Sequence, residues 1–128
     1  MKLTEADALR VYARTINTLD ASQIETLLDD NFRCSSQWLI GEITSKQDYL
    51  DYLKSQLLEY QQSGVRPYAE MAVVSAWGHN ECVVMAEGEK ENLTATVFAT
   101  VRNGKILRID VCATPSPSET MRSGEYPA

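Results

Sequence analysis

Apolar and polar residues alternate along two stretches, 94–101 and 106–113, on either side of the dipeptide Asn103-Gly104. Asn-Gly is the preferred pair for a two-residue type I′ turn, because both central positions of that turn need positive φ. The pattern therefore predicts a long β-hairpin. Both sides of the hairpin carry apolar residues, so we expect helices to cover one face and a second subunit to cover the other.

A two-residue turn would also determine which side chains of the hairpin oppose each other. One face would carry Val101/Ile106, Ala99/Arg108, Val97/Asp110 and Ala95/Cys112. The other would carry Thr100/Leu107, Phe98/Ile109 and Thr96/Val111. Charged side chains opposite small ones leave space, so we expect the Arg108 and Asp110 face to be concave and the other face to be outer. A bulge would change which residues oppose Asp110.

Three earlier segments have apolar residues at the three- and four-residue spacing of a helix. They cover residues 4–19, a short stretch from Ser22 to about Asn31, and residues 45–64. Thr4 with Asp7 and Ser22 with Glu25 form capping-box patterns at the first two segments, and Ser45 is expected to cap the third through Asp48. The third segment is expected to lie on the sheet. Residues 32–44 between the last two segments indicate a strand or a bent hairpin.

The second half of the chain has the pattern of an antiparallel sheet. Four strand-like runs at residues 68–77, 82–87, 94–101 and 106–113 are separated by short turns. Helices first and strands afterwards predict a segregated α+β fold, with one domain over residues 1–114. Residues 115–128 are rich in Pro, Ser, Gly and charge, which predicts a mobile C-terminal tail.

Composition narrows the classes of function. The 128 residues carry 12 basic and 18 acidic side chains, a net charge of −6 without a basic cluster, which argues against nucleic-acid binding. No apolar run is long enough to span a membrane and no signal peptide is recognised. Three scattered cysteines predict a reducing, cytoplasmic location. No metal, cofactor or phosphate-binding motif is present, so no cofactor is expected.

The order of these elements resembles the nuclear transport factor 2-like (NTF2-like, SnoaL-like) superfamily. The resemblance spans residues 6–113 and rests on Tyr12, Leu19-Asp20, residues 27–32, Gly41 and residues 103–106. It implies a cone-shaped fold in which three N-terminal helices pack on a curved antiparallel β-sheet. It also implies a small-molecule pocket between the third helix and the concave sheet, and often a homodimer. The run Ser35-Ser36-Gln37-Trp38 is similar to small bacterial members without an assigned reaction.

The resemblance also suggests roles for individual residues. Tyr12 matches the tyrosine with which ketosteroid isomerases stabilise an oxyanion. The base of those enzymes falls at about Ser36 and their second acidic donor at about Val97, neither of which supports that chemistry. Asp110 approximately matches an acid on the last strand of cyclase-like members. His79, the only histidine, falls in a predicted turn, which argues against a histidine-assisted dehydratase mechanism.

Two interpretations of the site remain open. In the first, Asp110 is a general base and Tyr12 a hydrogen-bond donor in proton-transfer lyase, isomerase or cyclase chemistry. In the second, Asp110 only pairs with Arg108, and the protein is a non-catalytic ligand-binding or protein-interaction dimer. The candidate ligand-binding residues are Trp38, Arg108, Ser36 and Tyr52, although helical spacing also explains Tyr52 as core. The expected ligand is small and apolar, or carries a carboxylate that binds Arg108.

Overall fold

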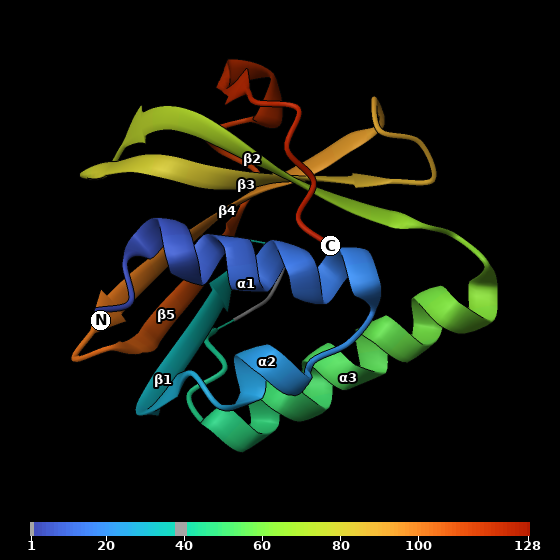
Figure 1. Ribbon diagram of the computed structural model, residues 1–128. Helices are drawn as coiled ribbons and strands as arrows, with labels where there is room; N and C mark the ends of the chain where they lie inside the picture. The colour runs from blue at the N-terminus through green and yellow to red at the C-terminus, as the bar shows by residue number, and fades with distance from the viewer. Residues whose placement is uncertain (1, 38–40) are drawn as a thin grey trace.

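The computed structural model describes residues 2–37 and 41–128 and has an α+β architecture (Figure 1). Its elements are α1 (Glu5–Thr18), α2 (Ser22–Glu25), β1 (Leu28–Ser36), α3 (Lys46–Ser63), β2 (Pro67–Ala76), β3 (His79–Glu87), β4 (Leu93–Arg102), β5 (Lys105–Cys112), the 3-10 helix η1 (Pro117–Glu119) and β6 (Met121–Arg122). The six strands form one sheet in the order β1-β5-β4-β3-β2-β6. The sheet is mixed, because β1 runs parallel to β5 while the other pairs are antiparallel.

Helix α1 follows its sequence signals closely. The Thr4 hydroxyl accepts a hydrogen bond from the Asp7 N–H, and the Asp7 carboxylate accepts one from the Thr4 N–H, both at 3.1 Å. This capping box satisfies two amide groups that have no partner inside the helix. The apolar stripe of the helix is buried at Ala8, Leu9, Tyr12, Ala13 and Ile16. Because the stripe is continuous, α1 lies flat against the sheet (Figure 1).

The second helix is shorter than predicted, and Ser22 is its first residue instead of the cap, so the predicted capping box with Glu25 is wrong. It ends at Glu25, and residues 28–36 form strand β1 instead of continuing the helix. Leu28, Phe32 and Cys34 are buried, and these even-numbered positions point to one face of an extended strand. A strand therefore separates α2 from α3, so the three helices are not consecutive.

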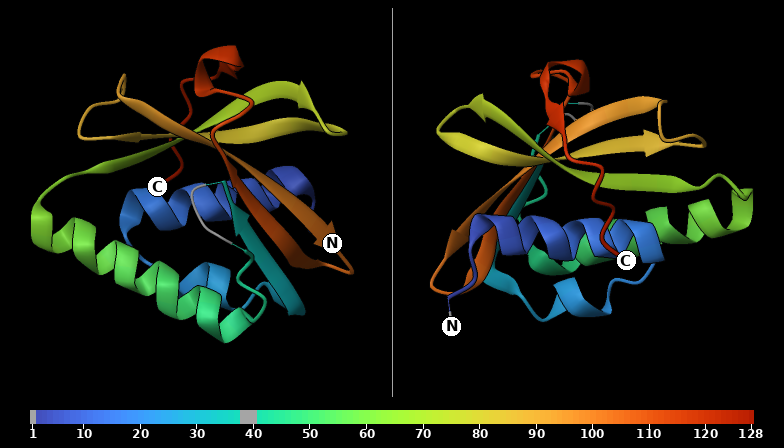
Figure 2. Two further views of the ribbon diagram at one scale, coloured as in Figure 1. Left: turned by 180° about the vertical axis from the view of Figure 1, so that it is seen from behind. Right: turned by 45° about the horizontal axis from the view of Figure 1, so that its top comes forward.

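Helix α3 begins where the Ser45 hydroxyl accepts a hydrogen bond from the Asp48 N–H, at 3.0 Å. It ends at Gly64, whose φ of 75° is readily adopted by glycine alone. Tyr49, Leu50, Leu53 and Leu57 form its buried stripe. Figure 2 shows α1 and α3 on the same side of the sheet, with η1 on the opposite side. No helix in the described ranges is both long and apolar enough to cross a bilayer.

The predicted hairpin turn is confirmed, but the register beyond it is different. Arg102 pairs with Lys105 and Val101 with Ile106, with positive φ at Asn103 and Gly104. The next pair is Thr100 with Arg108, so Leu107 is the extra residue of a β-bulge. The predicted pairs Ala99/Arg108 and Val97/Asp110 are therefore wrong.

This bulge exchanges the two faces of β5. Ile106 and Ile109 are both fully buried in the core beneath the helices, although three residues separate them. Asp110 instead pairs with Phe98, which belongs to a second apolar cluster on the opposite face. The expectation that Asp110 lies on the concave face is corrected, because one inserted residue inverts the alternation after it.

The C-terminal residues continue the domain instead of separating from it as a tail at residue 115. Strand β6 pairs with β2. The Met71 N–H donates to the Glu125 carbonyl at 2.9 Å, and the Asn17 side-chain amide donates to the Pro127 carbonyl at 2.7 Å. These contacts bring the end of the chain to α1 (Figure 2). A proline- and serine-rich composition did not reveal them, because they are mostly backbone hydrogen bonds.

Candidate functional site

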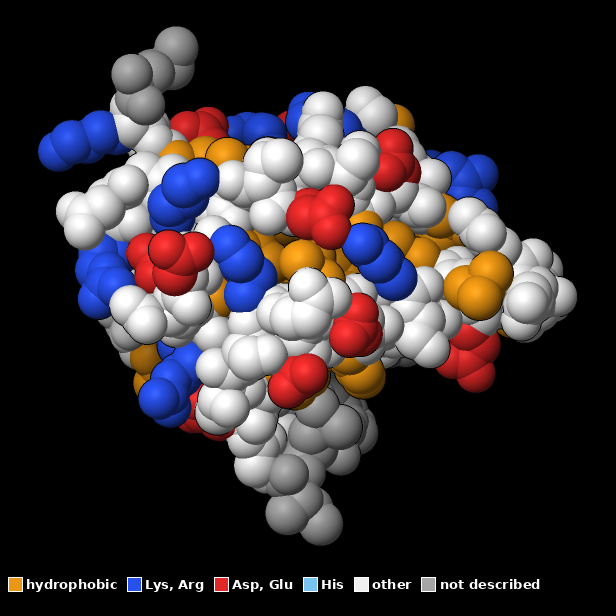
Figure 3. All heavy atoms as spheres, turned by 90° about the horizontal axis from the view of Figure 1, so that it is seen from below, with side chains coloured by type: hydrophobic (Ala, Val, Ile, Leu, Met, Phe, Trp, Pro, Cys, Tyr) orange, Lys and Arg blue, Asp and Glu red, His pale blue; other side chains and the backbone are white. Residues whose placement is uncertain are grey.

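A cavity of about 460 Å³ opens between α3, α1 and the helix-facing side of the sheet. Its described lining residues are Tyr12, Ile16, Cys34, Ser36, Tyr49, Tyr52, Leu53, Gln56, Tyr60, Met85, Glu87, Thr94, Ala95 and Val111. On the side of the molecule seen in Figure 3, apolar side chains are visible between charged ones. The volume and the largely apolar lining are typical of small-molecule sites.

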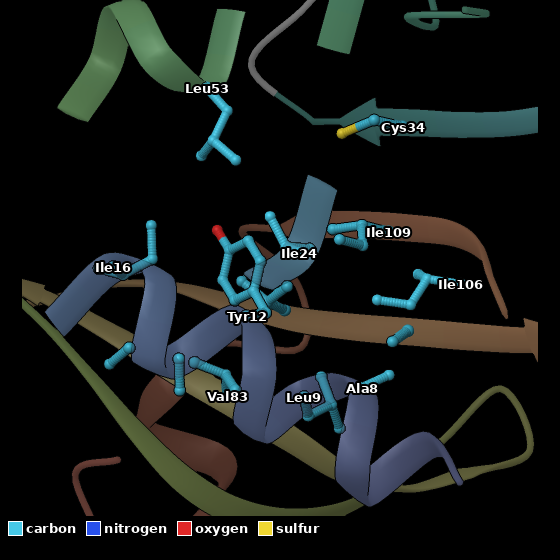
Figure 4. Packing of buried hydrophobic residues seen from close by; sticks show 14 of the residues in the cluster. Ala8, Leu9, Tyr12, Ile16, Ile24, Cys34, Leu53, Val83, Ile106 and Ile109 are labelled. Atoms are coloured by element: carbon cyan, nitrogen blue, oxygen red, sulfur yellow. The ribbon is translucent and has the colours of Figure 1, made fainter. Parts of the chain in front are cut away.

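Tyr12 reaches this cavity from the buried stripe of α1. Its side chain points away from the helix axis, and its hydroxyl is directed toward Leu53 of α3 (Figure 4). Burial is the main cause that raises the pKa of Tyr12, so the hydroxyl stays protonated at neutral pH. The structure shows no hydrogen-bond partner for it among the described residues. Tyr12 is therefore a neutral hydrogen-bond donor facing the cavity.

Helix α3 contributes further tyrosines to the same wall. The ring of Tyr49 packs on Phe32, with 4.7 Å between the ring centroids, and burial raises the pKa of Tyr49. Tyr52 lies closer to solvent, and its hydroxyl accepts a hydrogen bond from Gln56 Nε2 at 2.9 Å. These positions follow from helical spacing, because residues three and four apart lie on one side of α3.

A hydrogen-bonded pair at the end of the cavity was missed by sequence reasoning. The Tyr60 hydroxyl donates to Glu87 Oε1 at 2.6 Å, and both residues line the cavity. Burial and then this hydrogen bond raise the pKa of Tyr60. Tyr60 was assigned to the helix core by spacing, and Glu87 was the last residue of a predicted strand. Nothing local in the sequence indicates that the ends of α3 and β3 meet.

The predicted catalytic pair, Asp110 and Tyr12, does not converge. Asp110 Oδ1 accepts a hydrogen bond from Arg108 Nε at 2.9 Å and another from the Ser35 hydroxyl. Arg108 also pairs with Glu42, at 3.0 Å, which is the main cause that raises its pKa. Neither Asp110 nor Arg108 lines the cavity. The alternative interpretation, an ion pair between the two, describes their geometry.

The other predicted site residues divide into two groups. Ser36 and Tyr52 line the cavity, as does Tyr12. Trp38 lies outside the described residues. Cys34 also lines the cavity, and burial raises the pKa of its thiol to about 12. Since the thiolate is the reactive form, Cys34 behaves there as an apolar wall. The described residues contain no group of three or more side chains suited to hold a metal ion.

Solved structures with the same architecture exist at low sequence identity. An NTF2-like protein of unknown function from Cytophaga hutchinsonii is 14% identical, with a TM-score of 0.61 over 90% of this chain and 96% of that one. A protein proposed to be a polyketide cyclase, from Sinorhizobium meliloti, is 12% identical, with a TM-score of 0.58 over 83% of this chain and 94% of that one. A SnoaL-like protein of unknown function from Burkholderia thailandensis is 14% identical, with a TM-score of 0.56 over 97% and 100%.

No protein-family model matches the chain, and no curated protein matches it. The structural likenesses show that the chain shares the fold of these NTF2-like and SnoaL-like proteins, in agreement with the resemblance seen in the sequence. Identities of this size establish the fold and leave the function to be argued from the site itself.

Proposed function

We propose that this protein binds a small molecule in the cavity between α3 and the sheet. The observation that carries the proposal is a cavity of about 460 Å³ whose wall presents the Tyr12 hydroxyl, which has no hydrogen-bond partner among the described residues. A hydroxyl that faces a largely apolar cavity can donate a hydrogen bond to a bound ligand or to water. Leu53, Met85 and Val111 supply apolar surface for the rest of the ligand.

Proton-transfer catalysis is the second candidate. The Tyr60 and Glu87 pair favours it, because a carboxylate and a proton donor lie together in a largely apolar cavity. The reaction would be of the lyase, isomerase or cyclase type, with Glu87 as base and Tyr12 as hydrogen-bond donor. Asp110 has no part in this scheme, since its carboxylate is engaged on the other face of the sheet.

Binding can be tested with N-phenyl-1-naphthylamine, a weakly basic apolar dye that is uncharged at neutral pH and fluoresces in apolar surroundings. We expect saturable binding at one site per chain, and loss of at least tenfold in affinity in Gln56→Trp, which places an indole at the cavity wall. Ser55→Trp puts the same side chain on the exposed side of α3 and should leave affinity unchanged. Absence of binding, or equal binding by both variants, contradicts the proposal.

We also propose that the protein forms a homodimer through the outer face of the sheet. Trp77 is 64% exposed there, and its ring packs edge-on against Phe98 with 5.7 Å between the centroids. Val74, Ala76 and Leu93 extend the apolar surface. We expect a dimer at tens of micromolar in sedimentation equilibrium, and a monomer for Trp77→Glu because the new carboxylate would be desolvated at the interface. A monomeric parent protein contradicts this proposal.

A further inference from the structure

The charges around the cavity are of one sign. Among its described lining residues, Glu87 is the one carboxylate, no lysine, arginine or histidine is present, and burial raises the pKa of Tyr12, Tyr60 and Cys34 so that these three stay protonated at neutral pH. A second hollow of about 320 Å³ shares Gln56, Tyr60 and Glu87 with the cavity and adds Glu59. The cavity and this adjoining hollow therefore carry negative charge.

The neighbouring cations do not neutralise this charge. Arg66 lies over the Tyr68 ring at 5.0 Å, and Lys90 lies 4.4 Å from the centroid of Tyr126. Neither Arg66 nor Lys90 lines the cavity. The hydrogen bond that the structure gives the Glu87 carboxylate comes from Tyr60, and a carboxylate has room to accept several more. The Glu87 carboxylate can therefore accept a hydrogen bond from a ligand.

The walls also suit a positive charge. Tyr52 and Tyr60 both line the cavity on the α3 side. The face of an aromatic ring attracts a cation, and this attraction strengthens where water is partly excluded. The Tyr60 hydroxyl, whose proton is directed at Glu87, leaves its oxygen lone pairs available as a second acceptor.

We propose that the ligand is a small organic amine, bound as its ammonium ion, with an aromatic or aliphatic body. The ammonium group donates to Glu87 and to the Tyr60 oxygen, and the body extends toward Tyr12 and Leu53. This inference rests on the proposed function of the cavity as a binding site. It replaces the carboxylate-bearing ligand suggested by the sequence, because Arg108 lies on the other face of the sheet and an anion would meet Glu87.

Three probes of almost equal shape test the charge preference: tryptamine (cation), tryptophol (neutral) and indole-3-acetate (anion). Each is measured by isothermal titration and by displacement of N-phenyl-1-naphthylamine. We expect tryptamine to bind about tenfold more tightly than tryptophol, because a charge-assisted hydrogen bond exceeds a neutral one by about that factor. Indole-3-acetate should bind weakest. Glu87→Gln should reduce the preference for tryptamine to twofold or less and leave tryptophol binding unchanged.

Glu89→Gln is the matched control, since it removes the same charge from an exposed residue two positions away. It should keep the preference for tryptamine. Equal binding of the three probes by the parent protein, with dye binding intact, overturns the amine assignment and leaves the small-molecule site in place. A preference for tryptamine that survives in Glu87→Gln also overturns it. Failure of the dye to bind overturns both the site and the assignment.

Discussion

Replacing Arg122 with leucine is expected to lower the free energy of unfolding by about 3 kcal/mol. Glu70 is a carboxylate with only 4% of its surface exposed, and Arg122 Nε contacts its Oε1 at 2.6 Å. The other oxygen of Glu70 accepts from the Gly124 N–H at 2.8 Å. Without the Arg122 guanidinium, the nearly buried Glu70 carboxylate would lose its cation. It would keep only the hydrogen bond from the Gly124 N–H. Urea denaturation at neutral pH measures the loss.

Two further variants separate this effect from a general loss of charge. Arg10→Leu removes another arginine that ties the C-terminal segment to the domain, but the Arg10 and Glu125 side chains are 44% and 47% exposed. An exposed pair of this kind contributes at most about 1 kcal/mol. Adding Glu70→Gln to Arg122→Leu should restore stability in part, because the buried charge is then absent. Equal losses in Arg10→Leu and Arg122→Leu would contradict this account.

The Arg122 and Glu70 pair also shows why the C-terminal segment was misjudged from the sequence. Arg122 and Glu70 are 52 positions apart, and Glu70 alone looks like a costly carboxylate in an apolar strand. The cost is offset by a partner from a segment whose composition suggests disorder. Composition describes only what a segment can bury by itself. Here the folded domain supplies the edge of β2, with which β6 pairs, and the Glu70 carboxylate, which binds Arg122.

Elements specified by neighbouring residues were predicted well. Thr4 and Ser45 cap α1 and α3, and Asn103-Gly104 makes the turn between β4 and β5. Helix α2 was predicted too long because Leu27 and Leu28 fit a helix as well as a strand entry. The local pattern therefore predicted the element type correctly wherever the apolar residues fitted either the helical spacing or the strand alternation, but not both.

The candidate site was predicted only in part for a related reason. Of the predicted site residues, Tyr12, Ser36 and Tyr52 line the cavity, and their roles there stay predictions. Glu87 was missed because its meeting with Tyr60 depends on how α3 crosses the end of β3. Asp110 was assigned to the wrong face because its position depends on a bulge that no residue type in the sequence marks.

Deleting Ile109 is expected to have the largest effect of any single change considered for this protein. If the bulge at Leu107 stays, the deletion moves Asp110 opposite Ala99, and if the strand closes the bulge instead, it moves Arg108 there. Ala99 is 2% exposed in the core beneath the helices. One charge therefore enters the core in either register, and the buried Ile109 side chain is lost from it.

Desolvating that charge and losing the buried Ile109 side chain should together cost more than about 5 kcal/mol, which is comparable with the whole stability of a domain of this size. We therefore expect the deletion variant to lose the near-ultraviolet circular dichroism and the dispersed amide resonances of the parent protein. Leu107→Ala keeps the bulge and removes only a half-buried side chain, so it should cost about 1 kcal/mol.

Deleting Leu107 is the matched control, because it shortens β5 by one residue and leaves Arg108 opposite Thr100 and Asp110 opposite Phe98. Both charges then stay on the outer face, so this variant should keep the fold of the parent protein and lose at most about 2 kcal/mol. Equal losses in the two deletion variants would contradict this account. The stability would then depend on the length of the strand and not on which side chains face the core.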